Sequence, residues 1–254
     1  MKVNLENQVA IITGGSRGIG AATVKLFADS GARVVFSYLR AAREAQALVK
    51  AGGGIDRVVA VRADVAKMTD AKRLVETALR QFGRLDILVA NAGIWNYAPL
   101  PIEKMRERDW DEMMAVNLKG VFSVIRHAVP QMIRQQDGRI IVVSSTAGQR
   151  GEALHTHYGA SKGGVISLVK GLATELAPHH IIVNCVAPGW IETDMARPVI
   201  KNPRMRREAI SVIPLRRFGR PEEVAMPILF LASPLASYIT GEVVNINGGN
   251  VLCG

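Results

Sequence analysis

A tyrosine and a lysine four residues apart form the chemically most informative pair in this sequence. Tyr158 and Lys162 would share one face of a helix, about a turn apart, if this stretch is helical. A tyrosine hydroxyl has an ordinary pKa of about 10 and is a poor acid at neutral pH, but a nearby ammonium group stabilises the phenolate. The pair therefore predicts a side chain that can exchange a proton with a substrate oxygen.

A serine could assist this pair at the same oxygen. Ser145 lies thirteen residues before Tyr158, next to Ser144 at the end of an apolar run. Its hydroxyl could hydrogen-bond the oxygen of a carbonyl group while hydride moves between a nicotinamide and the carbonyl carbon. A single Tyr-x-x-x-Lys pair is also typical of an exposed helix face, and alone it favours that interpretation. The secondary-structure elements around the pair are therefore needed to decide between a catalytic site and an exposed helix face.

Seven short β-branched apolar runs alternate along the chain with stretches of helical apolar spacing. Strands that are apolar on both faces belong in a parallel sheet covered by helices. The expected fold is α/β, a Rossmann-type doubly wound sheet of about seven parallel strands with helices on both faces, in a single domain over residues 1–254. The runs are Gln8–Thr13, Arg33–Ser37, Arg57–Ala63, Leu85–Ala90, Arg139–Ser144, Ile181–Ala187 and Val243–Ile246, and the helical stretches include Ala41–Ala51, Asp70–Phe82 and Ser161–Leu176.

A glycine-rich turn follows the first predicted strand, at the sheet edge where ligands bind in such folds. Residues 13–20 read TGGSRGIG, and a helix is expected from about Ala21. Glycines allow a tight turn and close approach to a ligand, and the helix start offers free N–H groups to a pyrophosphate. The G-x-x-x-G-x-G spacing differs from G-x-G-x-x-G, and a tight turn without a ligand is the alternative. The residues expected to cradle a dinucleotide are Gly14, Ser16, Arg17, Gly18, Ile19 and Gly20.

The end of the second predicted strand indicates which dinucleotide. NAD-binding units usually carry a carboxylate there, which binds the ribose 2′-hydroxyl. Here residues 36–40 read FSYLR, without a carboxylate and with Arg40. Arg40 and Arg17 could pair with a 2′-phosphate, which a carboxylate would repel. The sequence thus favours NADP(H) as the cofactor, with NAD(H) as the alternative. If Arg40 has no role in binding, it would be a solvated arginine at a helix start.

The composition fits a globular protein and leaves an excess of basic residues to explain. Of 254 residues, 48% are hydrophobic, and the formal net charge is +10. No apolar run approaches the roughly 20 residues that span a bilayer. The first seven residues lack the apolar core of a signal peptide, so a cytoplasmic location is expected. The charge suggests nucleic acid, but few aromatic residues interleave with the arginines and no nucleic-acid motif is present.

The remaining motifs occur in one order along the chain. An NAG triplet at residues 91–93 follows the fourth predicted strand, Asn117 lies in the next helix, and Pro188-Gly189 follows the sixth strand. With the glycine-rich turn, Ser145, Tyr158 and Lys162, this order resembles the short-chain dehydrogenase/reductase family over essentially the whole chain. Residues 214–224 (PLRRFGRPEEV) and 241–249 (GEVVNINGG) are similar to its 3-oxoacyl-(acyl-carrier-protein) reductase-like branch.

The resemblance implies a role for each matching position. Tyr158 would be the general acid in reduction and the base in oxidation. Lys162 would lower its pKa and bind the nicotinamide ribose, and Ser145 would orient the carbonyl. Asn117 would hold the water that links Lys162 to solvent. The other positions would contact the cofactor: Asp64 and Val65 at the adenine, Asn91, Ala92 and Gly93 at its ribose, and Pro188, Gly189, Ile191 and Thr193 over the nicotinamide.

The resemblance also implies a homotetramer, paired through helices around residues 104–134 and 158–176, and a mobile substrate lid at residues 190–220. Eight cations gather in this lid: Arg197, Lys201, Arg204, Arg206, Arg207, Arg216, Arg217 and Arg220. They form either a solvated face or a surface that attracts an anionic substrate, such as a coenzyme A ester. Carrier-protein reductases of the family tend to carry arginines near the ends of the two interface helices. Residues 134–137 (RQQD) and 177–180 (APHH) keep only Arg134, which argues against an acyl carrier protein.

These observations favour NADP(H)-dependent reduction of a ketone or 3-oxoacyl thioester, a small-molecule carbonyl substrate, to the secondary alcohol. The alternative enzymatic activity is that of a dehydrogenase of a sugar, polyol or other secondary alcohol. A non-catalytic nucleotide-binding sensor or scaffold is the alternative of another class, against which the intact set of Asn117, Ser145, Tyr158 and Lys162 argues. His155 and His157 flank the tyrosine, where such histidines are more often supporting residues. No metal site is expected, and Cys185 is predicted in the core.

Overall fold

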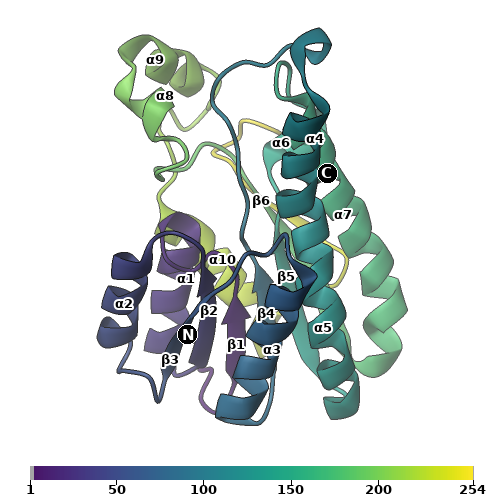
Figure 1. The fold of residues 1–254 in the computed structure, drawn as a ribbon. Coiled ribbons are helices and arrows are strands. Elements are labelled where there is room, and N and C mark those ends of the chain that lie inside the picture. The colour runs from purple at the N-terminus through teal and green to yellow at the C-terminus, as the bar shows by residue number, and fades with distance from the viewer. Residues whose placement is uncertain (1–2, 254) are drawn as a thin grey trace.

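Seven parallel strands form one sheet in the computed structural model, which describes residues 3–253 (Figure 1). Their spatial order is β3-β2-β1-β4-β5-β6-β7, so the predicted doubly wound fold is confirmed. Every strand pair is parallel, as expected for runs that are apolar on both faces. The strands are β1 Val9–Ile12, β2 Arg33–Tyr38, β3 Val58–Arg62, β4 Ile87–Ala90, β5 Gly138–Val143, β6 Ile181–Pro188 and β7 Val243–Ile246.

Helices cover both faces of this sheet and bury its two apolar surfaces separately. One core packs α3, α5 and α7 on the sheet, with Leu74, Val124 and Val169 among its buried residues. The other packs α1, α2 and α10, with Phe27 and Ile228 among its buried residues. The helices are α1 Gly18–Asp29, α2 Ala42–Ala51, α3 Met68–Phe82, α4 Glu107–Met114, α5 Gly120–Gln135, α6 Thr146–Arg150, α7 Thr156–Leu176, α8 Arg197–Lys201, α9 Pro203–Ser211 and α10 Pro221–Leu231.

The strand order reverses between β1 and β4, and this switch point lies at the carboxyl edge of the sheet. The Thr13 hydroxyl accepts hydrogen bonds from the backbone N–H groups of Asn91 and Ala92, both at 3.0 Å. The Asn91 side chain in turn donates to the Thr13 carbonyl at 2.9 Å. The two loops that leave the central strands are therefore fixed to each other where ligands bind in doubly wound sheets.

The segment between β6 and α10 forms a separate layer above this edge. Figure 1 shows α8 and α9 standing away from the other helices, over the carboxyl ends of the strands. A small third core holds this layer together around the buried side chains of Val199, Ala209 and Phe218. Trp95 and Trp190 pack against it from the loops that follow β4 and β6. Residues 190–220 thus cover the sheet edge on which the predicted site lies.

Two local departures from the predicted elements concern the site. Helix α1 begins at Gly18 rather than near Ala21, so the last glycines of the turn are already helical. Asn117 lies in a π-helical segment, Ala115–Lys119, which joins α4 to α5. Such a bulge leaves no mark in apolar spacing, and it often occurs at functional sites. Within residues 3–253, no helix is long and apolar enough to cross a membrane.

Candidate active site

Tyr158 and Ser145 meet where β5 ends and α7 begins. Ser145 caps the short helix α6, and its Oγ accepts a hydrogen bond from the Ala147 N–H at 3.1 Å. Tyr158 lies in the first turn of α7, close enough to Ser145 for that side chain to act on the pKa of its phenol. Both residues are half-buried, so their hydroxyl groups are fixed by the fold and still border solvent. One substrate oxygen could contact both.

Lys162 lies one turn further along α7 and is almost fully buried, with 4% of its surface exposed. Its Nζ donates a hydrogen bond to the Val143 carbonyl at 2.8 Å, at the end of β5. Burial lowers the pKa of Lys162 from 10.5 to about 8, because an ammonium group is poorly solvated there. The Ser144 hydroxyl donates to the Lys162 carbonyl at 2.8 Å and so ties α7 to the same strand.

The pKa of Tyr158 departs from the expectation drawn from its spacing to Lys162. Burial raises the pKa of this phenol, and the hydrogen bond with Ser145 opposes the rise. Lys162 does not contribute the predicted lowering of this pKa, and its Nζ donates instead to the Val143 carbonyl. The phenol is accordingly protonated at neutral pH, which is the form that can donate a proton.

Asn117 fixes the loop after β4 against α7. The side chain is fully buried; its Oδ1 accepts from the Ile94 N–H at 2.8 Å, and its Nδ2 donates to the Ile94 carbonyl at 2.9 Å. A Cβ built on Gly93 would lie 3.3 Å from both the Asn117 Oδ1 and the Lys162 Nζ. The three residues therefore converge, as the predicted site requires, although the Asn117 side chain is already paired with protein groups.

The glycine-rich turn forms a tight cradle at the start of α1. Gly14 and Gly18 have positive φ angles of 66° and 54°, which glycine adopts without strain. The first turn of α1 has no side-chain cap, since the residue before it is Arg17 in an extended conformation. Its N–H groups and the helix dipole suit an anion such as a pyrophosphate. Predicted cradle residues Ser16 and Ile19 are half-buried in this turn.

Gly20 allows the turn to close on itself, and its replacement should be costly. A Cβ there would come within 2.2 Å of the Gly14 carbonyl oxygen. We expect Gly20→Ala to lower the free energy of unfolding by about 1–3 kcal/mol and to weaken dinucleotide binding. Chemical denaturation measures the first effect. Gly171→Ala in α7 is the matched control, because nothing lies within 4 Å of that position; equal stability of the two variants would contradict the packing argument.

The two arginines proposed for a 2′-phosphate lie in different environments. Arg17 forms an ion pair with Asp194 of the upper layer, at 3.2 Å, in which both side chains are about half exposed. Arg40 follows β2 and is exposed, and no carboxylate pairs with it among residues 3–253. The partner of Arg17 comes from 177 positions further along the chain, which spacing arguments could not reveal.

The remaining predicted cofactor residues border the same edge. Asp64 is engaged locally: its Oδ1 accepts from the Ala66 N–H at 3.1 Å, while Val65 is buried beside Gly120. Beyond Pro188 at the end of β6, the Gly189 N–H donates to the Ile246 carbonyl at 3.0 Å. Two further positions lie above the turn. Ile191 is buried, and the side chain of Thr193 lies directly against Gly18.

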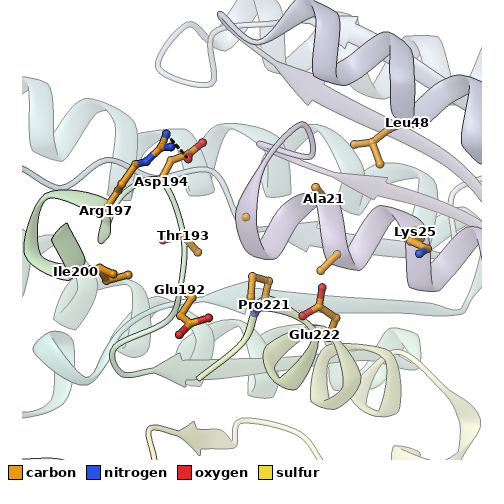
Figure 2. Close-up of a pocket in the computed structure, with 12 residues that line it drawn as sticks. Ala21, Lys25, Leu48, Glu192, Thr193, Asp194, Arg197, Ile200, Pro221 and Glu222 are labelled. Carbon is orange, nitrogen blue, oxygen red and sulfur yellow. Dashed lines mark ion pairs between the residues drawn. The ribbon is translucent and has the colours of Figure 1, made fainter. Parts of the chain in front are cut away.

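Two cavities flank the segment that leads into the upper layer. The first, of about 540 Å³, lies between α1 and that segment; Gly18, Thr193, Asp194 and Arg197 border it, as Figure 2 shows for the labelled residues. The second, of about 590 Å³, lies beside Trp190 and reaches the segment after β7. The upper layer therefore borders the glycine-rich turn on one side and the loop after β6 on the other.

Sequence reasoning missed an aromatic cluster beside Tyr158. The Trp95 ring centroid lies 6.5 Å from that of Tyr158 and 5.7 Å from that of Trp190. Trp190 in turn meets Phe218 edge-on at 6.0 Å. The signal was present, because Trp95 follows the NAG triplet closely and Trp190 follows Pro188-Gly189 directly. Cys185 is fully buried in β6, as predicted, and burial raises the pKa of its thiol to about 12.

The cations of the upper layer are partly neutralised. Arg197 pairs with Asp194, Arg204 with Glu208 and Arg217 with Glu223. Among the residues that the structure describes, the others form no ion pair with a carboxylate: Lys201, Arg206, Arg207, Arg216 and Arg220. The excess of positive charge predicted for this segment is therefore real, and five of the eight cations carry it.

Known proteins resemble this chain over its whole length. The sequence model of a family described as Enoyl-(Acyl carrier protein) reductase matches residues 14–250. The 3-oxoacyl-(acyl-carrier-protein) reductase FabG of Thermotoga maritima is 47% identical over 98% of this chain and 100% of that protein. A Synechocystis 3-oxoacyl-(acyl-carrier-protein) reductase is 42% identical over 98% of both chains. A crystal structure from Brucella melitensis, titled a short-chain dehydrogenase/reductase and glucose/ribitol dehydrogenase, superposes with a TM-score of 0.92 at 36% identity over both full chains.

Proposed function

The chain belongs to the short-chain dehydrogenase/reductase family of oxidoreductases, and we propose that it reduces a ketone or 3-oxoacyl thioester to the secondary alcohol with NADP(H). The observation that carries this proposal is the placement of Tyr158 beside Ser145, both half-buried at the carboxyl edge of the sheet. Two donors on one substrate oxygen, next to a turn shaped for a dinucleotide, suit proton transfer coupled to carbonyl reduction.

The chain's own residues would do the following in that reaction. Ser145 and Tyr158 would donate hydrogen bonds to the carbonyl oxygen and polarise the C=O bond. Tyr158 would then transfer its proton to this oxygen as negative charge develops on it. Lys162 would supply a positive charge behind Tyr158 once its Nζ leaves the Val143 carbonyl, and Asn117 would hold the loop after β4 through its hydrogen bonds to Ile94. A bound nicotinamide supplies the hydride.

The residues present fit such a cofactor. The uncapped first turn of α1 and the positive-φ glycines provide N–H groups for a pyrophosphate. Lys162 and Tyr158 would hold the nicotinamide ribose. Around the cradle, the cofactor would be bound by Gly14, Ser16, Arg17, Gly18, Ile19, Gly20, Asp64, Val65, Asn91, Ala92, Gly93, Pro188, Gly189, Ile191 and Thr193. Residues 190–220 would act as the lid over it.

The preference for NADP(H) rests on Arg40. Its guanidinium lies at the end of β2 without a carboxylate partner among the described residues, so it is free for a 2′-phosphate. We expect Arg40→Ala to lower kcat/KM for NADPH by about tenfold or more and to leave kcat/KM for NADH nearly unchanged. Steady-state kinetics with both cofactors measures this. Arg80→Ala, on the exposed face of α3, is the control; equal losses with both cofactors would contradict the assignment.

We further propose that four copies of the chain associate. Two large apolar side chains are exposed on the predicted interface helices, Trp110 at 40% on α4 and Phe122 at 43% on α5. Exposed aromatic residues on neighbouring helices are typical of protein interfaces. Light scattering is expected to give the mass of four 27.5-kDa chains, and the double variant Trp110→Glu with Phe122→Glu is expected to give smaller species. A wild-type mass of one chain would contradict this.

A substrate screen tests the proposed reaction. NADPH oxidation is followed with acetoacetyl-CoA, the same acyl group on a carrier protein, simple ketones and ketoses. We expect activity with ketones or the thioester. Carrier-protein docking is not part of the proposal, because residues 134–137 (RQQD) and 177–180 (APHH) keep only Arg134 of the arginines expected there. Activity only with ketoses or polyols would favour the sugar dehydrogenase, and cofactor binding without turnover would favour a sensor.

A further inference from the structure

Trp95 is the aromatic residue next to the proposed proton donor. Its ring meets the Tyr158 ring edge-on, with centroids 6.5 Å apart. It is half-buried, so part of its surface is exposed. Because the two rings are in contact, a substituent of a carbonyl group bound at the Tyr158 hydroxyl can reach the Trp95 ring.

The fold holds Trp95 in place from below. His155, with 8% of its surface exposed, lies beneath it with ring centroids 5.2 Å apart. The loop that carries Trp95 is fixed at both ends: Asn117 binds both backbone groups of Ile94, and the Leu100 N–H donates to the Leu154 carbonyl at 2.8 Å. Trp95 is therefore a preorganised surface rather than a mobile side chain.

The lid completes an aromatic wall around this ring. Trp190 meets Trp95 at an interplanar angle of 82°, and Phe218 meets Trp190 at 90°. The buried core of the lid packs on both tryptophans. Edge-to-face contacts of this kind add to the free energy that burial of apolar area provides. A flat apolar group that enters beside Trp95 would extend this series of rings.

The wall offers little to a polar substituent. The Nε2 of His155 and the Nδ1 of His157 have no hydrogen-bond partner among the described residues, but both atoms are buried, so a substrate hydroxyl group does not reach them. A polyhydroxylated chain would leave most of its hydroxyl groups without partners against the rings, and such unpaired groups strongly disfavour binding. The lack of hydrogen-bond partners for hydroxyl groups thus disfavours ketoses, in addition to any effect of their size.

We propose that Trp95 determines the substrate choice of this enzyme, and that the preferred substrates carry a flat apolar group, such as an aryl ring, on the carbonyl carbon. This inference rests on the proposed carbonyl reduction at Tyr158. His155 acts through Trp95 as a positioning residue. The aliphatic 3-oxoacyl group fits the same wall with less contact area, so it is a poorer substrate than its aryl counterpart.

The test compares three carbonyl compounds: ethyl benzoylacetate, ethyl acetoacetate and fructose, each reduced with NADPH. Wild type is expected to prefer the first over the second and to leave fructose unreduced. Trp95→Ala should lower kcat/KM for ethyl benzoylacetate by about tenfold or more, mainly through KM, and change that for ethyl acetoacetate by less than about threefold. Trp95→Phe should keep most of the preference, because it retains a ring.

Controls separate a local effect from misfolding. Tyr238→Ala removes a fully exposed aromatic side chain and should behave as wild type. His155→Phe keeps a ring beneath Trp95 and should keep the preference, whereas His155→Ala should weaken it. NADPH affinity should be unchanged in the Trp95 variants, and Trp95→Ala should melt at a lower temperature than wild type, because its ring contacts are lost, while staying folded at the assay temperature. Equal losses with both esters, or a wild-type preference for ethyl acetoacetate or fructose, would overturn the inference alone; reduction of none of the three would overturn the proposed function with it.

Discussion

Tyr158→Phe is expected to reduce kcat for carbonyl reduction by about 1,000-fold and to leave NADPH affinity within about twofold of wild type. Phenylalanine keeps the ring that packs against Trp95 and removes the hydroxyl group beside Ser145. The developing alkoxide would then have no proton donor, and Ser145 alone would polarise the carbonyl. Steady-state kinetics gives kcat, and fluorescence titration gives the NADPH affinity.

The control for this variant is Tyr238→Phe, at a fully exposed position. It should have wild-type kinetics. If Tyr158→Phe reduced ketones at a normal rate, Tyr158 would not be the proton donor. If it lost NADPH binding altogether, the hydroxyl group would serve cofactor binding and the assignment of a separate chemical step would be wrong.

Lys162→Met is expected to lower kcat for carbonyl reduction by about 100-fold, because Tyr158 would lose the ammonium group one helical turn away. The same variant should alter the pH dependence of stability. The Lys162 pKa is lowered from 10.5 to about 8 in the folded protein, so the unfolded chain binds more protons between pH 8 and 10.5. Wild-type stability therefore rises with pH in this window, by roughly 3 kcal/mol relative to the methionine variant.

Chemical denaturation of both proteins from pH 7 to pH 10 measures this difference. Lys170→Met is the matched control, since Lys170 lies on the same helix and is exposed. Its stability should follow that of wild type at every pH. If the Lys162→Met difference were independent of pH, the buried ammonium group would not carry a lowered pKa.

The fold could be predicted from the sequence because its signals are local. Each strand is a β-branched run that is apolar on both faces, and the glycines after β1 predict the turn there. The positions of Ser145, Tyr158 and Lys162 followed from strand ends and helical spacing. The residues that converge at the carboxyl edge could therefore be named in advance, while their roles in the reaction stay predictions.

Other features depend on contacts between distant segments and could not be predicted. Arg17 pairs with Asp194 because the segment after β6 lies next to the start of α1. Burial raises the pKa of Tyr158, while the Lys162 ammonium group donates its hydrogen bond to the Val143 carbonyl. The aromatic wall joins Trp95 and Trp190, whose loops follow different strands. Spacing along one element carries no information on such pairs.

The central claim is that this chain transfers a hydride and a proton to a carbonyl group, with Tyr158 as the proton donor. The most direct test incubates the wild-type protein with NADPH and acetoacetyl-CoA or ethyl benzoylacetate, and quantifies NADPH loss and the secondary alcohol by mass spectrometry. We predict one alcohol formed for each NADPH oxidised, and no alcohol above background with Tyr158→Phe. Oxidation of NADPH without formation of the alcohol would contradict this mechanism. So would alcohol formation by Tyr158→Phe at the wild-type rate.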